Sequence, residues 1–312
     1  MQETSFTHTA ADGTPLIVRQ WTPDNKASIR AVVQIVHGMA EHSARYRRLA
    51  QALTDAGYVI VAHDQRGHGE TAGSLEAAGD FGVRDGWGHL LSDALEINQW
   101  IHRSWPEIPH GLLGHSMGSF VTQNYLILHG RTIDAAVISA TDYSMGLLGP
   151  IARGIIKLIT VFGGRRYRSW FAEQISYKAF NKPFEPARTG FEWLSRDTAE
   201  VDKYIADPFC GFRCTNQFWL DFLGGLMDID SDSARSQIPK DLPVYLFAGD
   251  ADPVAKYGKG PTQLADAYRQ VGMRKVDLKL YAEGRHELFN DINRDEVTAD
   301  LIEWLNNHLA VN

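Results

Sequence analysis

Segments that favour strands and segments that favour helices alternate along most of the chain. Strands are predicted at residues 30–36, 58–62, 111–113, 135–140, 242–248 and 275–281. Apolar residues recur at helical spacing between them, in residues 44–56, 87–105, 119–129, 262–271 and 297–309. Continuous β-branched runs such as 30–36 are typical of strands buried on both faces of a parallel sheet. The alternation therefore predicts an α/β fold with a mostly parallel central sheet flanked by helices, and functional residues at the carboxyl ends of its strands.

The chain begins with a different pattern. Residues 4–10 and 16–21 predict two strands, and the segment between them contains Asp12, Gly13 and Pro15, residue types that favour turns. We therefore expect an antiparallel hairpin ahead of the parallel strands.

The alternation fails between residues 141 and 227. This segment contains 16 aromatic residues, a higher density than the 11% of the whole chain. We interpret it as a mainly helical cap inserted into a core domain formed by residues 1–140 and 228–312. More of its aromatic side chains are expected in the cap's own core than in a pocket. The candidates for lining an apolar substrate pocket are Phe162, Trp170, Phe209 and Trp219.

Residues 146–168 of the cap form a basic amphipathic segment. It contains five Arg and Lys residues and no acidic residue, with leucines and isoleucines at helical spacing. The segment is too short and too charged to span a bilayer. It indicates either peripheral membrane contact and a route for an apolar substrate, or a helix packed on its own domain with a solvated basic edge.

The net charge, the first residues and the two cysteines limit the class of protein that we expect. A net charge of -7 argues against a nucleic-acid partner, which requires a basic surface. No basic region followed by an apolar segment opens the chain, so a cytoplasmic location is expected. Cys210 and Cys214 could form half of a metal site or a disulfide, but no second ligand pair accompanies them, and we expect ordinary thiols.

The candidate chemistry centres on Ser116, which lies between a predicted strand and a predicted helix. Gly114 and Gly118 flank it in the pattern Gly-x-Ser-x-Gly. A serine hydroxyl is a weak nucleophile at neutral pH and needs exposure, a neighbouring base and donors for the oxyanion that it generates. A sharp strand-to-helix turn supplies the exposure, and its crowding explains the glycines.

The partners of Ser116 are expected on later loops, in the order serine, carboxylate, histidine. Of the 12 histidines, only His286 and His308 follow the cap, and His308 falls within the last predicted helix. His286 lies just after the last strand and is the candidate base. Asp250 and Asp252 both follow the preceding strand, and either could orient the histidine.

Two backbone N–H groups should face the oxyanion. One is expected from Met117, which follows the serine, and the other from Met39, in the loop after strand 30–36. His37 in that loop, and His63 and His68 in residues 63–71, are interpreted as residues that fix their loops.

The whole chain resembles the α/β-hydrolase fold. Three segments, 37–46, 64–69 and 114–118, are similar to the monoacylglycerol lipase and lysophospholipase branch of that superfamily, and 207–212 is similar to bacterial lysophospholipases. Residues 249–254 resemble the segment that carries the acid in α/β-hydrolases. The resemblance thus assigns the orienting role to Asp252 and leaves Asp250 to stabilise the turn.

This combination predicts a serine hydrolase that cleaves monoacylglycerol- or lysophospholipid-like esters without a metal or organic cofactor. One alternative is a small-ester carboxylesterase. A second is an aminopeptidase of the same fold, which would need cap carboxylates for the substrate ammonium; the candidates are Glu173, Glu185, Glu192 and Glu200. A third is a fold that only binds a ligand, although such a protein has no reason to keep serine, acid and histidine on all three expected loops.

Overall fold

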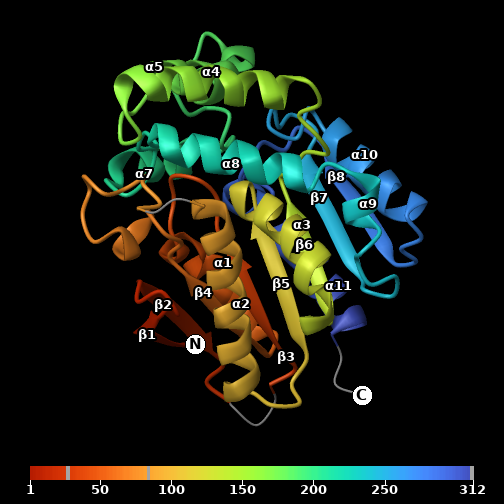
Figure 1. Ribbon diagram of the computed structural model, residues 1–312. Coiled ribbons are helices and arrows are strands. Elements are labelled where there is room, and N and C mark those ends of the chain that lie inside the picture. Colours follow the sequence, from red (N-terminus) through yellow and green to blue (C-terminus); the bar gives the residue numbers. More distant parts are fainter. Residues whose placement is uncertain (26–28, 83–84, 310–312) are drawn as a thin grey trace.

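An eight-stranded sheet forms the centre of the molecule (Figure 1). The computed structural model describes residues 1–25, 29–82 and 85–309. The strand order is β1-β2-β4-β3-β5-β6-β7-β8. The strands are β1 (Gln2–Thr9), β2 (Pro15–Thr22), β3 (Ala31–Val36), β4 (Tyr58–His63), β5 (His110–His115), β6 (Ala135–Ser139), β7 (Val244–Gly249) and β8 (Val276–Tyr281).

The pairing of the strands follows the sequence pattern. β1 and β2 form the antiparallel hairpin, whose turn is fixed by the Thr14 N–H donating to Asp12 Oδ1 at 3.0 Å. β2 pairs antiparallel with β4, and all later neighbours are parallel. Strands β3 to β7 are buried along their whole length, as their continuous apolar runs require.

Helices cover both faces of the sheet. On one face lie α1 (Arg47–Asp55), which follows a 3-10 turn at Ser43–Tyr46, and α11 (Arg294–His308). On the other lie α2 (Gly86–Ser104), α3 (Met117–His129) and α10 (Lys259–Gln270). The predicted strands and helices outside the cap are all present, with ends within three residues of the expected positions. The predicted α/β fold is therefore confirmed.

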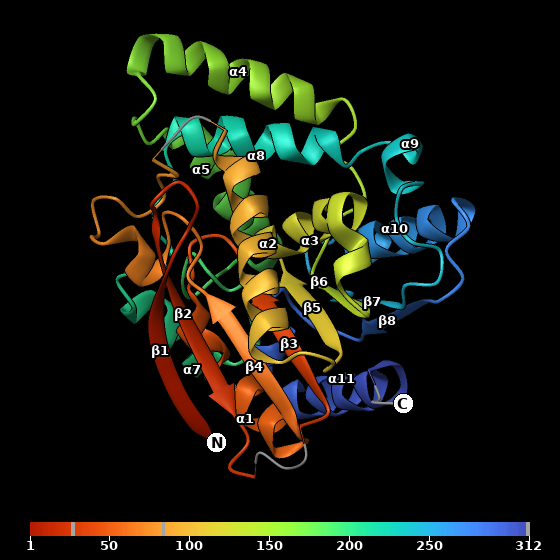
Figure 2. The same cartoon turned by 60° about the horizontal axis from the view of Figure 1, so that its bottom comes forward.

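The segment after β6 crosses the carboxyl ends of the strands. Its helices are α4 (Leu148–Gly163), α5 (Trp170–Glu173), α6 (Ala179–Asn181), α7 (Thr198–Ala206) and α8 (Asn216–Asp228), with short turns between them, and α9 (Asp232–Arg235) follows. Figures 1 and 2 both show α4 lying along α8 and away from the sheet. The cap helices therefore stand over the edge of the sheet where the loops of Ser116 and His286 begin.

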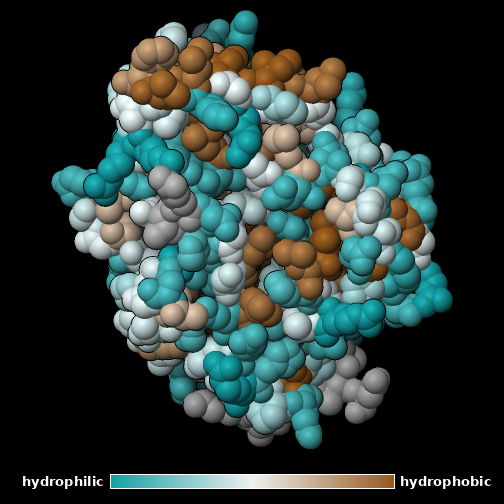
Figure 3. All heavy atoms as spheres, viewed as in Figure 1, coloured by the Kyte–Doolittle hydropathy of each residue, from teal (hydrophilic) through white to brown (hydrophobic). Residues whose placement is uncertain are grey.

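Helix α4 packs through a narrow stripe only. Gly149 and Ile156 are its buried residues, and Ala152 and Ile159 are partly buried. The remaining apolar residues point outward, and Figure 3 shows them gathered over α4. We call this surface the α4 outer face; it consists of Leu147, Leu148, Ile151, Ile155, Leu158, Val161 and Phe162. None of the described helices combines the length and the apolar character needed to cross a membrane.

The loop after β4 is fixed by a buried ion pair. Arg66 donates to both carboxylate oxygens of Asp93 on α2, at 2.6 and 2.8 Å, and to both oxygens of Asp12 at 2.7 and 3.0 Å. Arg66 and Asp93 are buried, so each charge has lost contact with water and is stabilised by the other instead. The guanidinium thus ties the hairpin turn and α2 to this loop.

Replacing Arg66 with methionine should lower the free energy of unfolding by about 3–5 kcal/mol, because the Asp93 carboxylate is left buried without a counter-ion. Urea titration followed by tryptophan fluorescence measures the change. Arg47→Met is the matched control, since the Arg47–Glu3 pair is largely exposed and should contribute less than about 1 kcal/mol. Equal losses in the two variants would contradict the prediction.

Candidate active site

Ser116 lies at the sharp turn between β5 and α3. Its φ of 52° is in the left-handed region that residues other than glycine rarely adopt. A Cβ on Gly114 would lie 2.2 Å from Thr122 Oγ1, and a Cβ on Gly118 would lie 2.0 Å from the Val36 carbonyl oxygen. Only glycine therefore permits this close approach between the turn and the end of β3.

His286 and Asp252 form a buried pair on loops that follow the parallel neighbours β8 and β7. His286 Nδ1 lies 2.9 Å from Asp252 Oδ2. Burial alone would lower the pKa of His286, but the nearby carboxylates, Asp252 foremost, outweigh it and raise the pKa. With Nδ1 directed at Asp252, Nε2 is the ring nitrogen available to accept a proton. His286 and Ser116 line the same cavity.

The two aspartates after β7 have different contacts. Asp250 is exposed and its Oδ1 accepts from the Glu283 N–H at 2.6 Å. Asp252 is buried, and its Oδ1 accepts from the Val254 N–H at 2.8 Å while Oδ2 faces His286. The geometry thus matches the expected division between a residue that stabilises the turn and one that orients the histidine.

His37 fixes the loop that follows β3. Its Nε2 accepts from the Gln65 N–H at 2.9 Å, so the proton resides on Nδ1, which lies 2.7 Å from the Gly38 carbonyl oxygen. Burial lowers the pKa of His37 to about 3, so the ring stays neutral and keeps this tautomer. Because a trans peptide carries its C=O and N–H on opposite sides, the Met39 N–H points away from the His37 ring.

Met39 and Met117 line the cavity beside Ser116. Met117 is the first residue of α3, where the helix itself provides no acceptor for the backbone N–H. The structure therefore brings together the candidate nucleophile, the candidate base and both candidate oxyanion donors.

The cavity encloses about 270 Å³ between the sheet and the cap. Apolar side chains from α3, α4, α8 and the loop before α4 line it, namely Phe120, Met145, Leu148, Ile156, Trp219, Phe222, Leu223 and Leu226. Aromatic residues from the segment between α4 and α8 also line it, namely Tyr177, Phe180, Trp193 and Tyr204. Leu148 also belongs to the α4 outer face, so the cavity lining continues onto that surface.

The four aromatic residues expected in the pocket have different positions. Trp219 lines the cavity, whereas Phe162, Trp170 and Phe209 are not among its described lining residues. The side chains of Phe162 and Trp170 are 85% and 59% exposed. The expectation for these three is therefore corrected. For Phe162 the reason is the orientation of α4, which turns Ile156 toward the protein and leaves Phe162 on an outward side of the helix.

A contact that the sequence analysis missed joins the cap to the histidine loop. The backbone N–H groups of His286 and Glu287 donate to the carbonyl oxygens of Trp193 and Leu194, at 3.2 and 2.7 Å. The ring centroids of Trp193 and His286 lie 4.9 Å apart. No local pattern could have indicated this contact, because it joins segments about 90 residues apart.

The carboxylates that line the cavity are paired with cations. Asp142 Oδ2 lies 2.8 Å from Lys256 Nζ, and Arg45 contacts both Glu41 and Glu287. An incoming ammonium group would have to compete with these resident cations.

The cap carboxylates considered for a peptidase lie elsewhere. Glu185 is exposed, Glu192 Oε1 accepts from the Thr189 hydroxyl at 2.9 Å, and Glu200 Oε1 pairs with Arg48 at 3.0 Å. These three are not among the described residues of the cavity lining. The side chain of Glu173 lies outside the described residues.

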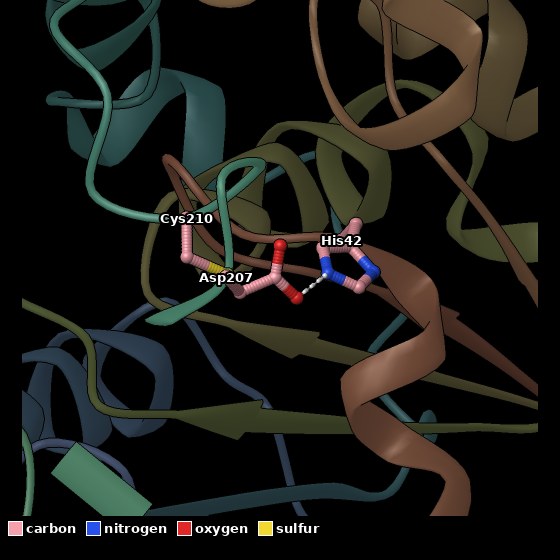
Figure 4. A group of neighbouring side chains, drawn as sticks. All are labelled: His42, Asp207 and Cys210. Carbon is pink, nitrogen blue, oxygen red and sulfur yellow. Dashed lines mark hydrogen bonds and ion pairs between the residues drawn. The ribbon is translucent and has the colours of Figure 1, made fainter. Parts of the chain in front are cut away.

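His42, Asp207 and Cys210 are close enough to hold a metal ion, with donor atoms within 4.8 Å of one another (Figure 4). His42 Nε2 and Asp207 Oδ2 point toward each other and are 2.9 Å apart. Burial raises the pKa of the Cys210 thiol, and a protonated thiol is a poor metal ligand. The pair is therefore better explained as a link between the loop after β3 and the cap. Cys210 and Cys214 are both free thiols.

His63 and His68 are fully buried and lie outside the described lining of the cavity. Burial lowers their pKa values to about 4 and about 3, which keeps both rings neutral. His68 Nδ1 lies 2.8 Å from the Arg66 carbonyl oxygen, a contact within its own loop. Among the described residues, the ring nitrogens of His63 have no hydrogen-bond partner, so the structure shows a loop contact for His68 and none for His63.

A mostly parallel sheet with a serine turn after β5 and acid and histidine loops after β7 and β8 defines an α/β-hydrolase. The family model described as serine aminopeptidase, S33 (Hydrolase_4), matches residues 27–293. The chain belongs to this family.

Individual relatives extend the comparison. The chain is 27% identical to monoglyceride lipase of Rattus norvegicus, over 96% of this chain and 90% of that protein. It is 26% identical to monoacylglycerol lipase of Mycolicibacterium smegmatis, over 95% of each chain. It is similar to the crystal structure of a carboxyl esterase from Bacillus coagulans, with a TM-score of 0.91, 26% identity and coverage of 99% and 100%. The resemblance to the monoacylglycerol lipase branch is thus confirmed.

Substituting Gly118 with alanine should slow covalent labelling of Ser116 by a fluorophosphonate probe by roughly 10²-fold, because the new Cβ would push the serine turn away from β3. Labelling followed by mass spectrometry measures the rate. Gly154→Ala is the matched control, since a Cβ at this helical position meets no atom within 4 Å and should leave labelling unchanged. A Gly118→Ala protein labelled at the wild-type rate would contradict the role of the close approach.

Proposed function

We propose that the chain is a serine carboxylic-ester hydrolase that cleaves monoacylglycerol- or lysophospholipid-like esters through an acyl-enzyme on Ser116. The observation that carries the proposal is the buried His286–Asp252 pair, 2.9 Å apart, on the same apolar cavity as Ser116. The names of the rat and mycobacterial relatives support glycerol esters as the substrate class.

In the proposed reaction, Ser116 Oγ attacks the ester carbonyl carbon while His286 Nε2 takes its proton. The N–H groups of Met39 and Met117 stabilise the oxyanion of the tetrahedral intermediate. The alcohol then leaves with the proton from His286. A water molecule, deprotonated by His286, attacks the acyl-enzyme, releases the acid and regenerates the serine. Asp252 holds the histidine tautomer and stabilises the imidazolium throughout.

The cavity favours an acyl chain over an amine. Its lining is dominated by apolar and aromatic side chains, and transfer of a hydrocarbon chain from water to such a surface is favourable. Its carboxylates Glu41, Asp142 and Glu287 are already paired with cations, which supports an ester substrate over one with a terminal ammonium group.

Ser116→Ala should reduce hydrolysis of the preferred ester by on the order of 10⁴- to 10⁶-fold, because the nucleophile is lost while the cavity is retained. The assay uses p-nitrophenyl esters from acetate to palmitate, together with 1-monoacylglycerol and lysophosphatidylcholine. The highest serine-dependent rates are expected on medium or long acyl chains.

The other outcomes each contradict a named part of the proposal. Activity confined to acetate and butyrate would indicate a small-ester carboxylesterase. Serine-dependent release of an aminoacyl anilide without ester turnover would indicate an aminopeptidase. A Ser116 that no fluorophosphonate probe labels would indicate a fold that only binds its ligand.

We further propose that the α4 outer face contacts a lipid surface peripherally. Seven apolar residues form it, and the exposed Lys157 and Arg165 lie beside it with no acidic residue between 146 and 168. An apolar face with a basic border is complementary to anionic lipid. Leu148 joins this face to the cavity lining, so a lipid ester could move between them without crossing a polar surface.

Replacing both Leu158 and Phe162 with serine should reduce co-sedimentation with phosphatidylcholine–phosphatidylglycerol vesicles at least about tenfold, because both side chains are more than half exposed on this face. Leu128→Ser is the matched control, since Leu128 is an exposed leucine on α3. Binding that is unchanged in the double variant would overturn the proposal. So would a dimer in gel filtration that the double variant abolishes, which would assign the face to a second copy of the chain.

A further inference from the structure

A buried ion-pair network connects the loop after β3 to the loop of His286. Arg45 Nη1 and Nη2 donate to Glu287 Oε1 and Oε2 at 2.6 and 2.7 Å, and Nη1 also donates to Glu41 Oε2 at 2.9 Å. At least 89% of each of the three side chains is shielded from solvent. We call this network the Glu41–Arg45–Glu287 bridge.

One end of the bridge holds the candidate oxyanion loop. Glu41 Oε1 accepts from the Gly38 N–H at 2.6 Å and from the Tyr46 hydroxyl at 3.0 Å. The Gly38 carbonyl is held by His37, so both polar backbone groups of Gly38 are fixed. The following N–H, that of Met39, therefore cannot rotate unless the Glu41 or His37 contact breaks.

The other end of the bridge holds the candidate base. Glu287 follows His286 directly, and its backbone N–H donates to the Leu194 carbonyl oxygen. Glu287 Oε2 also accepts from Asn290 Nδ2 at 3.0 Å. A carboxylate with these contacts allows little movement of the His286 backbone.

The geometry points to Arg45 as a positioning residue that sets the oxyanion loop relative to His286 through its bidentate contact with Glu287 and its contact with Glu41. This inference rests on the proposed function, because it concerns the same serine chemistry. A guanidinium fork suits the task, since it can satisfy a carboxylate with two parallel hydrogen bonds and still reach a second one.

The bridge also sets the charge around His286. The titratable and charged groups that face this ring from the elements packed against it are Asp252, Glu287, Glu41, His115 and Arg45. Burial lowers the pKa of His115 to about 4, so it remains neutral. Glu287 and Glu41 raise the pKa of His286. Arg45 is bonded to both carboxylates, and its positive charge opposes theirs. Removing Arg45 should therefore raise the pKa of His286, and neutralising Glu287 should lower it.

The test measures kcat, KM and the acidic limb of kcat/KM against pH for four proteins: wild type, Arg45→Lys, Arg45→Met and Glu287→Gln. Activity requires neutral His286, so it falls as the pH drops through the pKa of this residue. We expect Arg45→Met to lower kcat by roughly 10²-fold with little change in KM, and to move the limb to higher pH. Glu287→Gln should move it to lower pH. Arg45→Lys should keep the wild-type limb but lose rate, since an ammonium lacks the fork.

The rate of fluorophosphonate labelling provides a second readout that needs no ester substrate, and thermal unfolding shows which variants fold. Arg47→Met is the matched control, because Arg47 lies two residues later, at the start of α1, and its side chain is exposed. Labelling that fails in the wild type would overturn the proposed function and the bridge together. Two results would overturn the positioning role of Arg45 alone, provided that the wild type is labelled. One is that the acidic limbs of kcat/KM in Arg45→Met and Glu287→Gln do not shift in opposite directions, and the other is full activity in Arg45→Lys. If Arg45→Met does not fold, the Lys and Gln variants decide.

Discussion

The site depends on the close packing of backbone against backbone at the Ser116 turn. The start of α3 approaches the end of β3 so closely that a single added Cβ at Gly118 would lie 2.0 Å from a carbonyl oxygen. This contact puts the serine, the amide that follows it and the loop with Met39 around one point. The strained φ of Ser116 is sustained because the sheet on both sides of β5 is rigid and buried. The candidate base and the cavity lining come from the remaining loops and from the cap.

The sheet and its helices could be predicted from the sequence, and so could the loops that carry the candidate serine, acid and base, because each depends on a local pattern at a fixed place in the order of elements. The choice between Asp250 and Asp252 could not be made from these patterns. Both follow the same strand and both contact the loop about 30 residues later. What separates them is that Asp250 binds a backbone N–H of that loop, whereas Asp252 binds the His286 ring. Only the resemblance to other hydrolases favoured Asp252 in advance.

The cap was harder to predict for a different reason. The apolar side of α4 is broader than the stripe that packs against the protein, so its periodicity does not determine which of its apolar residues face inward. The position of α8 selects Ile156 as the inward residue and leaves Phe162 outside. The roles of Trp193 and Arg45 depend on segments far apart in the chain. Such contacts are properties of the folded molecule and have no local signature.

The hydrogen bonds between the cap and the histidine loop have a consequence for how such proteins can diversify. Residues 192–196 bond to residues 285–291 through Arg285, Ser195 and Asp291 as well as through His286. Replacing residues 192–196 without residues 285–291 would therefore remove partners that the histidine loop uses. Residues 192–196 and 285–291 thus form one packing unit made of two separate stretches of chain.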